Sequence, residues 1–286
     1  MKALLSLLAI LVFATSHAQE PGDTLGRIKK SGEIRIGFVP DAPPLSFHDE
    51  NDNAIGYSID LCRRIALAAR DAVGLEQIRI LFVPLTRMED RIRAIEDGDI
   101  DIECGATTVT MSRRERVDFT LMTFITGSAV LSLKSSPVDT VDDLHGVEIA
   151  VLRDTTTEGV MRKVIEINEF DIDLRLIGSH DEGMRLLNEG KVKGYASDRA
   201  MLIGQVFRHA GADNQYAMTR NALSYEPYAF MVQRGDSAFR LVADKALAEQ
   251  FRGAGIRRLY QTWFGRYGEP LSPIVAAMYE FQAVGE

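Results

Sequence analysis

Residues 101–120 read DIECGATTVTMSRRERVDFT and lead from a β-like run through a hydroxyl-rich turn to a cluster of arginines. The β-like run is Ile100–Cys104, the turn is Gly105–Thr108, and the cluster is Ser112–Arg116. A guanidinium pairs with a carboxylate, and hydroxyl or backbone donors beside it bind the same anion. This order predicts an anion-binding turn at the end of a strand. An N-cap turn beside solvated arginines is the alternative.

Around this stretch, β-like runs alternate with amphipathic helical patterns in two series. In the first series, Ile34–Val39 and Ile78–Val83 are β-like, whereas Ser58–Arg70 and Arg87–Glu96 are helical. Such alternation predicts an α/β fold. The second series predicts another α/β unit with its own sheet, and its runs are Ala129–Leu133, Glu148–Leu152, Thr157–Ile167, Leu174–Ile177, Asp181–Asn188 and Gly194–Ala196.

The joins between the two series are β-like rather than rich in glycine, serine or proline. They are Thr123–Gly127 and Ser224–Tyr228, and the chain continues into β-like Tyr228–Gln233 and helical Ala238–Phe251 and Ile256–Phe264. This arrangement predicts two lobes joined by paired extended crossovers, with a discontinuous first lobe. The expected bounds are 19–123 and 228–286 for the first lobe and 124–227 for the second.

Residues 1–18 have the pattern of a secretory signal peptide. Lys2 precedes an apolar run from Ala3 to Phe13, which is too short to cross about 30 Å of hydrocarbon. Gln19 follows the expected cleavage point, where a lipoprotein would have cysteine. We therefore expect an exported protein without a lipid anchor, located in the periplasm.

The composition is acidic, with a formal net charge of −8, or −9 without Lys2, and no basic block. Nucleic acids and anionic membrane surfaces are poor partners for such a chain. Cys62 and Cys104 are its two cysteines, and a disulfide would need their Cα atoms within about 7 Å. A disulfide and two buried thiols are both open from sequence, and the lack of a Cys-x-x-Cys pair argues against a metal or redox site.

Motifs of common enzyme classes are missing. The chain has no P-loop, no His-Glu-x-x-His helix and no Gly-x-Ser-x-Gly elbow, and Gly253–Gly255 lacks the third glycine of a dinucleotide loop. We therefore expect no cofactor, no metal ion and no enzymatic activity.

Four motifs, in their order and spacing, resemble bacterial extracellular solute-binding proteins of family 3, especially glutamate/aspartate-binding proteins. They are Gly56-Tyr57-Ser58-x-Asp60, Glu103-Cys104-Gly105-Ala106-Thr107-Thr108, Asp154-Thr155-Thr156-Thr157-Glu158 and Trp263-Phe264. The resemblance covers nearly the whole mature chain. It implies a two-lobe periplasmic-binding-protein fold of type II with two hinge crossovers. It also implies a monomer that delivers an amino acid to the membrane permease of an ABC transporter.

The same resemblance implies a site for an amino-acid zwitterion, which needs a guanidinium, hydroxyl or backbone donors, and a carboxylate. Arg113 matches the arginine that binds the α-carboxylate, with Thr108 as a hydroxyl donor beside it. Asp198 matches the carboxylate that receives the α-ammonium. Thr156 matches a donor of the second lobe at a helix start, where free N–H groups favour an anion; a plain helix cap is its alternative.

Selectivity is expected to depend on Arg91 and His180, which match positions facing a distal carboxylate. This chain departs from the family pattern at three positions: a family arginine aligns with Val39, a pocket serine falls near Met88, and another serine is replaced by Ala106. Glutamate or aspartate is the favoured ligand, with another polar amino acid as the alternative. If His180 titrates near its ordinary pKa of about 6.5, affinity for an acidic ligand should fall as the pH rises from about 5.5 to 8.

Three further expectations stay open at this level. Phe47 could wall the pocket, or pack in the core. A dehydratase of prephenate-type acids could use the same scaffold with an added acid or base, for which Glu226 is the nearest candidate. A sensory module docking on a separate membrane receptor is the other alternative.

Overall fold

The structure is a computed structural model that describes residues 23–209 and 215–285. The signal peptide expected at 1–18 lies outside the described residues. Among the residues that are described, no helix has both the length and the apolar character needed to cross a membrane.

A five-stranded sheet forms the first lobe. Its order is β5 (Arg79–Pro84), β1 (Glu33–Phe38), β6 (Ile102–Glu103), β13 (Glu226–Gln233) and β7 (Val117–Thr126). β1 pairs in parallel with β5 and β6, whereas β13 runs antiparallel to β6 and β7. The accompanying elements are α1 (Thr24–Ser31), β2 (Asp41–Ala42), β3 (Ser46–His48), β4 (Ala54–Ile55), α2 (Tyr57–Ala72), α3 (Met88–Glu96), α4 (Met111–Arg114) and α8 (Ser237–Arg252).

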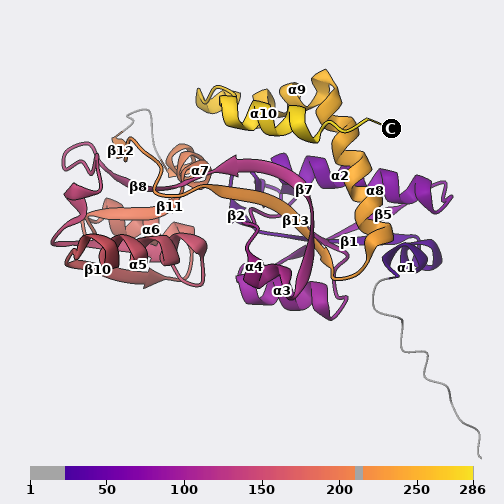
Figure 1. Ribbon diagram of the computed structural model, residues 1–286, viewed down its shortest axis with the longest axis horizontal. Helices are drawn as coiled ribbons and strands as arrows, with labels where there is room; N and C mark the ends of the chain where they lie inside the picture. The colour runs from indigo at the N-terminus through magenta and orange to yellow at the C-terminus, as the bar shows by residue number, and fades with distance from the viewer. Residues whose placement is uncertain (1–22, 210–214, 286) are drawn as a thin grey trace, which may run out of the picture.

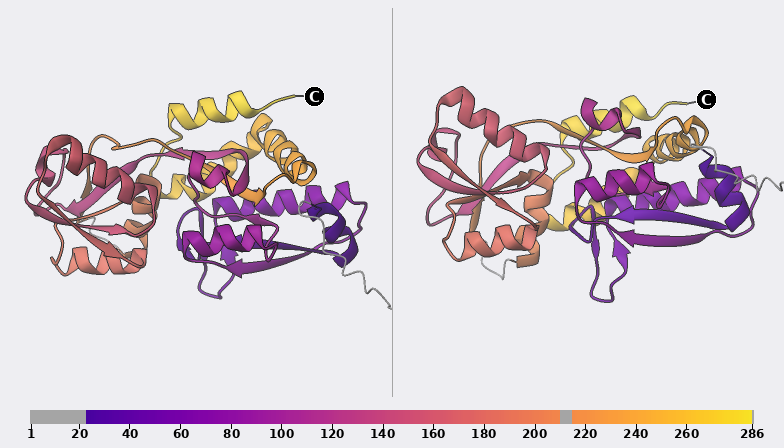
Figure 2. Two further views of the ribbon diagram at one scale, coloured as in Figure 1. Left: turned by 60° about the horizontal axis from the view of Figure 1, so that its bottom comes forward. Right: turned by 90° about the horizontal axis from the view of Figure 1, so that it is seen from below.

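The second lobe repeats this plan. Its sheet has the order β10 (Ile172–Ile177), β9 (Val147–Leu152), β11 (Gly194–Asp198), β8 (Ser128–Leu133) and β12 (Tyr216–Met218). Helices lie on both faces of this sheet in Figure 2, and they are α5 (Thr156–Asn168), α6 (His180–Asn188) and α7 (Arg199–His209). As in the first lobe, three parallel strands are followed by one antiparallel strand, here β8. The two-lobe type II fold is therefore confirmed.

Two crossovers join the lobes. β7 ends at Thr126 and β8 begins at Ser128, so Gly127 alone separates them; the return passes between Met218 and Glu226. Figure 1 shows β7 and β13 as two long ribbons side by side between the lobes, and Glu226 pairs with Thr126. The residue at which each lobe begins stays a prediction.

The C-terminal segment returns to the first lobe through α8, α9 (Ala254–Trp263) and α10 (Pro273–Gln282). Aromatic rings join this segment to the crossover strand, because Phe124 on β7 stacks on Phe264 at 4.7 Å between centroids. The side chain of Gln282 donates to the carbonyl of Met122 at 2.8 Å and accepts from its N–H at 2.7 Å. α10 thus satisfies backbone groups on the edge of β7.

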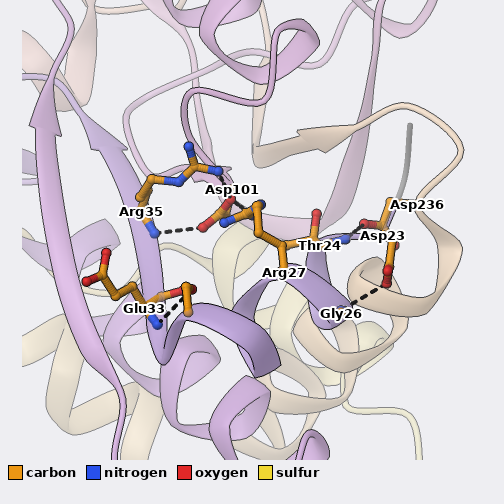
Figure 3. A network of polar contacts seen from close by, with 9 residues as sticks. Asp23, Thr24, Gly26, Arg27, Glu33, Arg35, Asp101 and Asp236 are labelled. Carbon is orange, nitrogen blue, oxygen red and sulfur yellow. Dashed lines mark hydrogen bonds and ion pairs between the residues drawn. The ribbon is translucent and has the colours of Figure 1, made fainter. Parts of the chain in front are cut away.

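Polar contacts hold α1 against the sheet, as Figure 3 shows. The carboxylate of Asp101, which is fully buried, forms ion pairs with Arg27 and Arg35 and accepts from the backbone N–H of Arg35 at 2.7 Å. The N–H of Thr24 donates to Asp236, the N-cap of α8, at 2.9 Å. The first helix is therefore bonded to both chain segments that make up the first lobe.

Cys62 and Cys104 form a disulfide, with their Cα atoms 6.4 Å apart. Sequence left this pairing open, and the structure brings α2 and the end of β6 together. The hydroxyl of Ser58 adds a hydrogen bond to the carbonyl of Gly105 at 3.0 Å. The turn that follows β6 is thus held to α2 by one covalent bond and one hydrogen bond.

Candidate functional site

A cavity of about 160 Å³ lies between the two lobes, and residues from both lobes line it. Its volume is below the ~300–1,000 Å³ typical of pockets for drug-sized ligands, which suits a small metabolite. Seven of the eight predicted ligand-binding residues line it, namely Arg91, Ala106, Thr108 and Arg113 from the first lobe and Thr156, His180 and Asp198 from the second. Val39 and Met88 line it as well.

Arg113 is positioned by the short helix α4. Thr110 is the N-cap, and its hydroxyl accepts from the N–H of Arg113 at 3.2 Å. The Nη1 atom donates to the carbonyl of Thr108 at 2.6 Å, and among the described residues this is the one acceptor that the guanidinium finds. Burial lowers the pKa of Arg113 to about 10, with a contribution from the charge of Arg91, so the group stays cationic at neutral pH. Arg113 can therefore offer charge and free donors to an anion in the cavity.

Two threonine hydroxyls meet across the cleft. The Oγ1 atoms of Thr108 and Thr156 are 3.4 Å apart, within hydrogen-bonding distance. The cap of α5 is Thr155, whose hydroxyl accepts from the N–H of Glu158 at 3.2 Å, and Thr156 is the first helical residue. Thr156 is therefore not the helix cap, and its hydroxyl faces the other lobe.

Asp198 ends β11 and is buried. Its Oδ1 accepts from the hydroxyls of Thr157 at 2.9 Å and Ser128 at 3.4 Å, and its Oδ2 accepts from the hydroxyl of Tyr228. Burial raises the pKa of Asp198 to about 6, and the nearby charge of Glu226 adds to the rise. A cation placed beside Asp198 would favour its ionised form.

Arg91 lies on α3 and is paired within the protein. Its Nη1 is 3.2 Å from Oε1 of the fully buried Glu103 and 3.1 Å from the hydroxyl of Thr107. Thr107 in turn donates to Oε2 of Glu103 at 2.8 Å. The Nε of Arg91 is buried without a partner among the described atoms. Arg91 therefore has a donor to spare, although its charge is already balanced.

His180 is the first residue of α6 and is buried at the cavity wall. Its Nδ1 hydrogen-bonds to the hydroxyl of Tyr195, which also forms a hydrogen bond with Ser197 that favours the phenolate. Which of the two groups donates in the contact with Tyr195 depends on the tautomer of the imidazole. Burial lowers the pKa of His180 below its ordinary value. The imidazole is therefore less protonated between pH 5.5 and 8 than the ordinary pKa of a histidine predicts.

Phe47 does not line this cavity. Its ring makes an edge contact with Trp263 at 5.8 Å between centroids, and it borders a separate surface hollow beside Phe207 and Tyr267. Phe47 is therefore a packing residue and not part of the pocket wall. The reason is that β3 directs this side chain toward α9.

Several lining residues were not predicted. They include Asp41, Thr86, Arg87, Arg153, Ser179, Ser197, Met201 and Tyr228. Ser179, Ser197 and Arg153 lie next to predicted residues or motifs in the sequence. That proximity was the signal by which they could have been found. Asp41 enters from the short strand β2, for which the sequence carried no such signal. Among the described residues, no group of three or more potential metal ligands is clustered.

A two-lobe α/β fold, with charged and hydroxyl side chains from both lobes in the cavity between them, defines a ligand-binding protein of the periplasmic type. The chain belongs to the bacterial extracellular solute-binding proteins, family 3, whose family model matches residues 34–266. An L-glutamate/L-aspartate-binding protein of Pseudomonas aeruginosa is 29% identical over 94% of this chain and 87% of its own length. The glutamate/aspartate import solute-binding protein of Salmonella typhimurium is 28% identical over 91% of this chain and 85% of its own length.

A solved structure of an ancestral arginine-binding protein bound to glutamine has the same fold. It is 27% identical, with a TM-score of 0.71, and the match covers 82% of this chain and 98% of that one. These proteins bind different amino acids on one scaffold. Membership of the family therefore indicates an amino-acid ligand, but it does not indicate which amino acid.

Proposed function

We propose that this protein captures a free amino acid in the interlobe cavity and delivers it, in the periplasm, to the permease of an ABC importer. One observation carries the proposal: Arg113 of the first lobe and Asp198 of the second line the same small cavity. A guanidinium and a carboxylate on opposite walls match the two charges of a zwitterion. Thr108 and Thr156 add hydroxyls from both lobes, so ligand binding and lobe closure favour each other.

The distal end of the cavity supports an acceptor group on the ligand side chain. Arg91 has an unpartnered Nε, and His180 contacts Tyr195 through Nδ1, so we propose that its Nε2–H serves as a second donor. Both residues are donors, so the side chains of lysine and arginine are poor candidates. We propose glutamate or aspartate as the ligand, which agrees with the names of the related binding proteins. Glu103 already balances the charge of Arg91. We therefore expect a smaller preference for glutamate over glutamine than a site with an unpaired arginine would have.

We propose binding without catalysis. A dehydratase would need an acid or base that reaches the substrate, and Glu226, the sequence candidate for that role, is not among the residues that line the cavity. Incubation with prephenate or arogenate tests this part, and product formation from either compound would contradict it.

A thermal-shift screen of the twenty amino acids tests the proposed function. A ligand that binds only the folded state raises stability by about 2.7 kcal/mol at a hundredfold excess over its Kd. Glutamate and aspartate should raise the melting temperature, and lysine and arginine should not. A screen in which no amino acid raises it would refute the proposal.

A further inference from the structure

Glu226, at the start of β13, is a buried carboxylate with incomplete compensation. It is 3% exposed, and its Oε1 accepts from the hydroxyl of Ser224 at 2.6 Å. Its Oε2 is buried and finds no hydrogen-bond partner among the described atoms. Burying a carboxylate without a cation or full hydrogen bonding is costly, so a group of this kind calls for a role.

Hydroxyl groups connect Glu226 to Asp198 across the hinge. Ser224 Oγ is 3.0 Å from Ser128 Oγ, and the two serines lie on different crossovers. Ser128 Oγ is 3.4 Å from Asp198 Oδ1 and 3.0 Å from the hydroxyl of Thr157, which itself donates to Asp198. The chain of hydrogen bonds therefore runs from Glu226 through both crossovers to the carboxylate of the cavity wall.

The charges around Asp198 are unequal. The titratable groups that face it from the surrounding elements are Glu226 and Tyr228 on β13, Arg113 on α4 and Tyr195 on β11. Burial raises the pKa of both tyrosines, so they are neutral. Arg113 is thus one cation beside two carboxylates, because the charge of Arg91 is paired with Glu103. This end of the cavity has one negative charge in excess.

We propose that Glu226 is a second acidic group of the ammonium subsite, which acts through Asp198 and selects ligands that bear an α-ammonium. The inference rests on the proposed function. Glu226 is a positioning residue, since it does not line the cavity. A bound ammonium supplies the cation that the two carboxylates lack, and the hydroxyl chain fixes them relative to each other.

Proton release is the consequence that can be measured. In the ligand-free protein, burial and the added charge of Glu226 raise the pKa of Asp198 to about 6, so Asp198 is partly protonated at pH 6. An ammonium beside Asp198 requires the ionised form, so binding at pH 6 should release roughly half a proton per ligand. Glutarate, which is glutamate without its amino group, should release none from Asp198.

The experiment is calorimetry with L-glutamate and glutarate on wild-type protein and on Glu226→Gln. Titrations at pH 6 in two buffers of different ionisation enthalpy give the number of protons released. Titrations at pH 8, where Asp198 is ionised in either protein, give the ratio of the two affinities. In Glu226→Gln, where burial alone still raises the pKa of Asp198, proton release should fall without vanishing, and the preference for glutamate over glutarate should fall about threefold to tenfold.

Glu269→Gln is the matched control, because Glu269 lies on the far side of the hinge, 3.9 Å from Arg199, and does not line the cavity. It should match wild type in both readouts. The inference would be overturned if Glu226→Gln released as many protons as wild type and kept the same preference for glutamate over glutarate. If that variant does not fold, the absence of proton release by wild type at pH 6 overturns it as well. Failure of wild type to bind any amino acid would instead refute the proposed function.

Discussion

The cavity is lined by two arginines, the buried Arg91 and the half-buried Arg113, whose charges are balanced differently. Arg113 donates to one backbone carbonyl, and its charge is left for a ligand. Arg91 forms an ion pair with the fully buried Glu103, and Thr107 completes the triad. A cation in a pocket wall is therefore not by itself a ligand group. Its partners decide whether it binds the ligand or stabilises the wall.

Because of this difference, we expect one end of the cavity to determine affinity and the other to determine selectivity. In the proposed binding mode, the end with Arg113 and Asp198 recognises the two groups that every amino acid shares, so we expect it to supply most of the binding free energy. The end with Arg91 and His180 meets the side chain with a balanced charge and a neutral imidazole. Val39, Met88 and Ala106 add no polar partner there. We therefore expect strong binding of amino acids and a modest preference among those whose side chains accept hydrogen bonds.

The largest expected effect is on stability, at the distal end. Arg91→Met leaves Glu103 buried without its cation, which should lower the free energy of unfolding by about 3–5 kcal/mol. Urea unfolding measures this loss, and Arg93→Met on the exposed side of the same helix is the control. If Arg91→Met were as stable as wild type and lost glutamate binding entirely, Arg91 would be the ligand's arginine and the two ends would not differ.

The next effect is on affinity, at the opposite end. Arg113→Ala removes the charge that faces the α-carboxylate and should weaken binding of every amino acid by about 2–5 kcal/mol. Calorimetry on Arg114→Ala provides the control, since Arg114 lies over the ring of Phe119 and does not line the cavity. Loss of less than about threefold in Arg113→Ala would show that the guanidinium is a surface charge.

The pH dependence should have opposite signs for stability and for binding. The pKa of Asp198 is raised in the folded state to about 6, so its contribution to stability is full below the unfolded pKa and is lost as the pH rises toward 7. Affinity should change in the other direction, because the ammonium needs an ionised Asp198, and should be about tenfold weaker at pH 5 than at pH 7.5. Asp198→Asn should abolish both trends. Affinity that falls with rising pH would point to His180 instead.

The smallest effect separates two adjacent threonines. Thr156→Val removes a hydroxyl that bridges the lobes and should weaken ligand binding by about 0.5–1.5 kcal/mol, with little change in stability. Thr155→Val removes the cap of α5 and should lower the free energy of unfolding by about 0.5–2 kcal/mol. Thermal unfolding and calorimetry on the pair measure both quantities. Equal behaviour of the two variants would remove Thr156 from the site.

Much of the fold could be predicted from local pattern. Strands β1, β5 and β9 and helices α2, α3 and α5 follow runs with clear periodicity. The missed elements are those whose stability comes from distant partners. α1 depends on Asp101 and Asp236, and α10 depends on the edge of β7 near Met122. Neither dependence is visible in the local sequence.

The site was predicted through resemblance to a family rather than through spacing. Thr108 and Arg113 are close in sequence, but Asp198 lies on the second lobe, and only the tertiary structure brings it to the same cavity. The pairing of Arg91 with Glu103 was missed because it joins α3 to β6, and the shift at His180 was missed because burial is a tertiary property. The place of Phe47 stayed open between pocket wall and core for the same reason, since its partner Trp263 is distant in sequence.

A crystal structure of the protein with bound L-glutamate tests the central claim most directly. We expect the α-carboxylate on the guanidinium of Arg113 and the α-ammonium on the carboxylate of Asp198, each at about 2.7–3.2 Å. The side-chain carboxylate should then lie toward Arg91 and His180. A ligand bound in the reverse orientation, with its side chain on Arg113, or outside the interlobe cavity, would contradict the account.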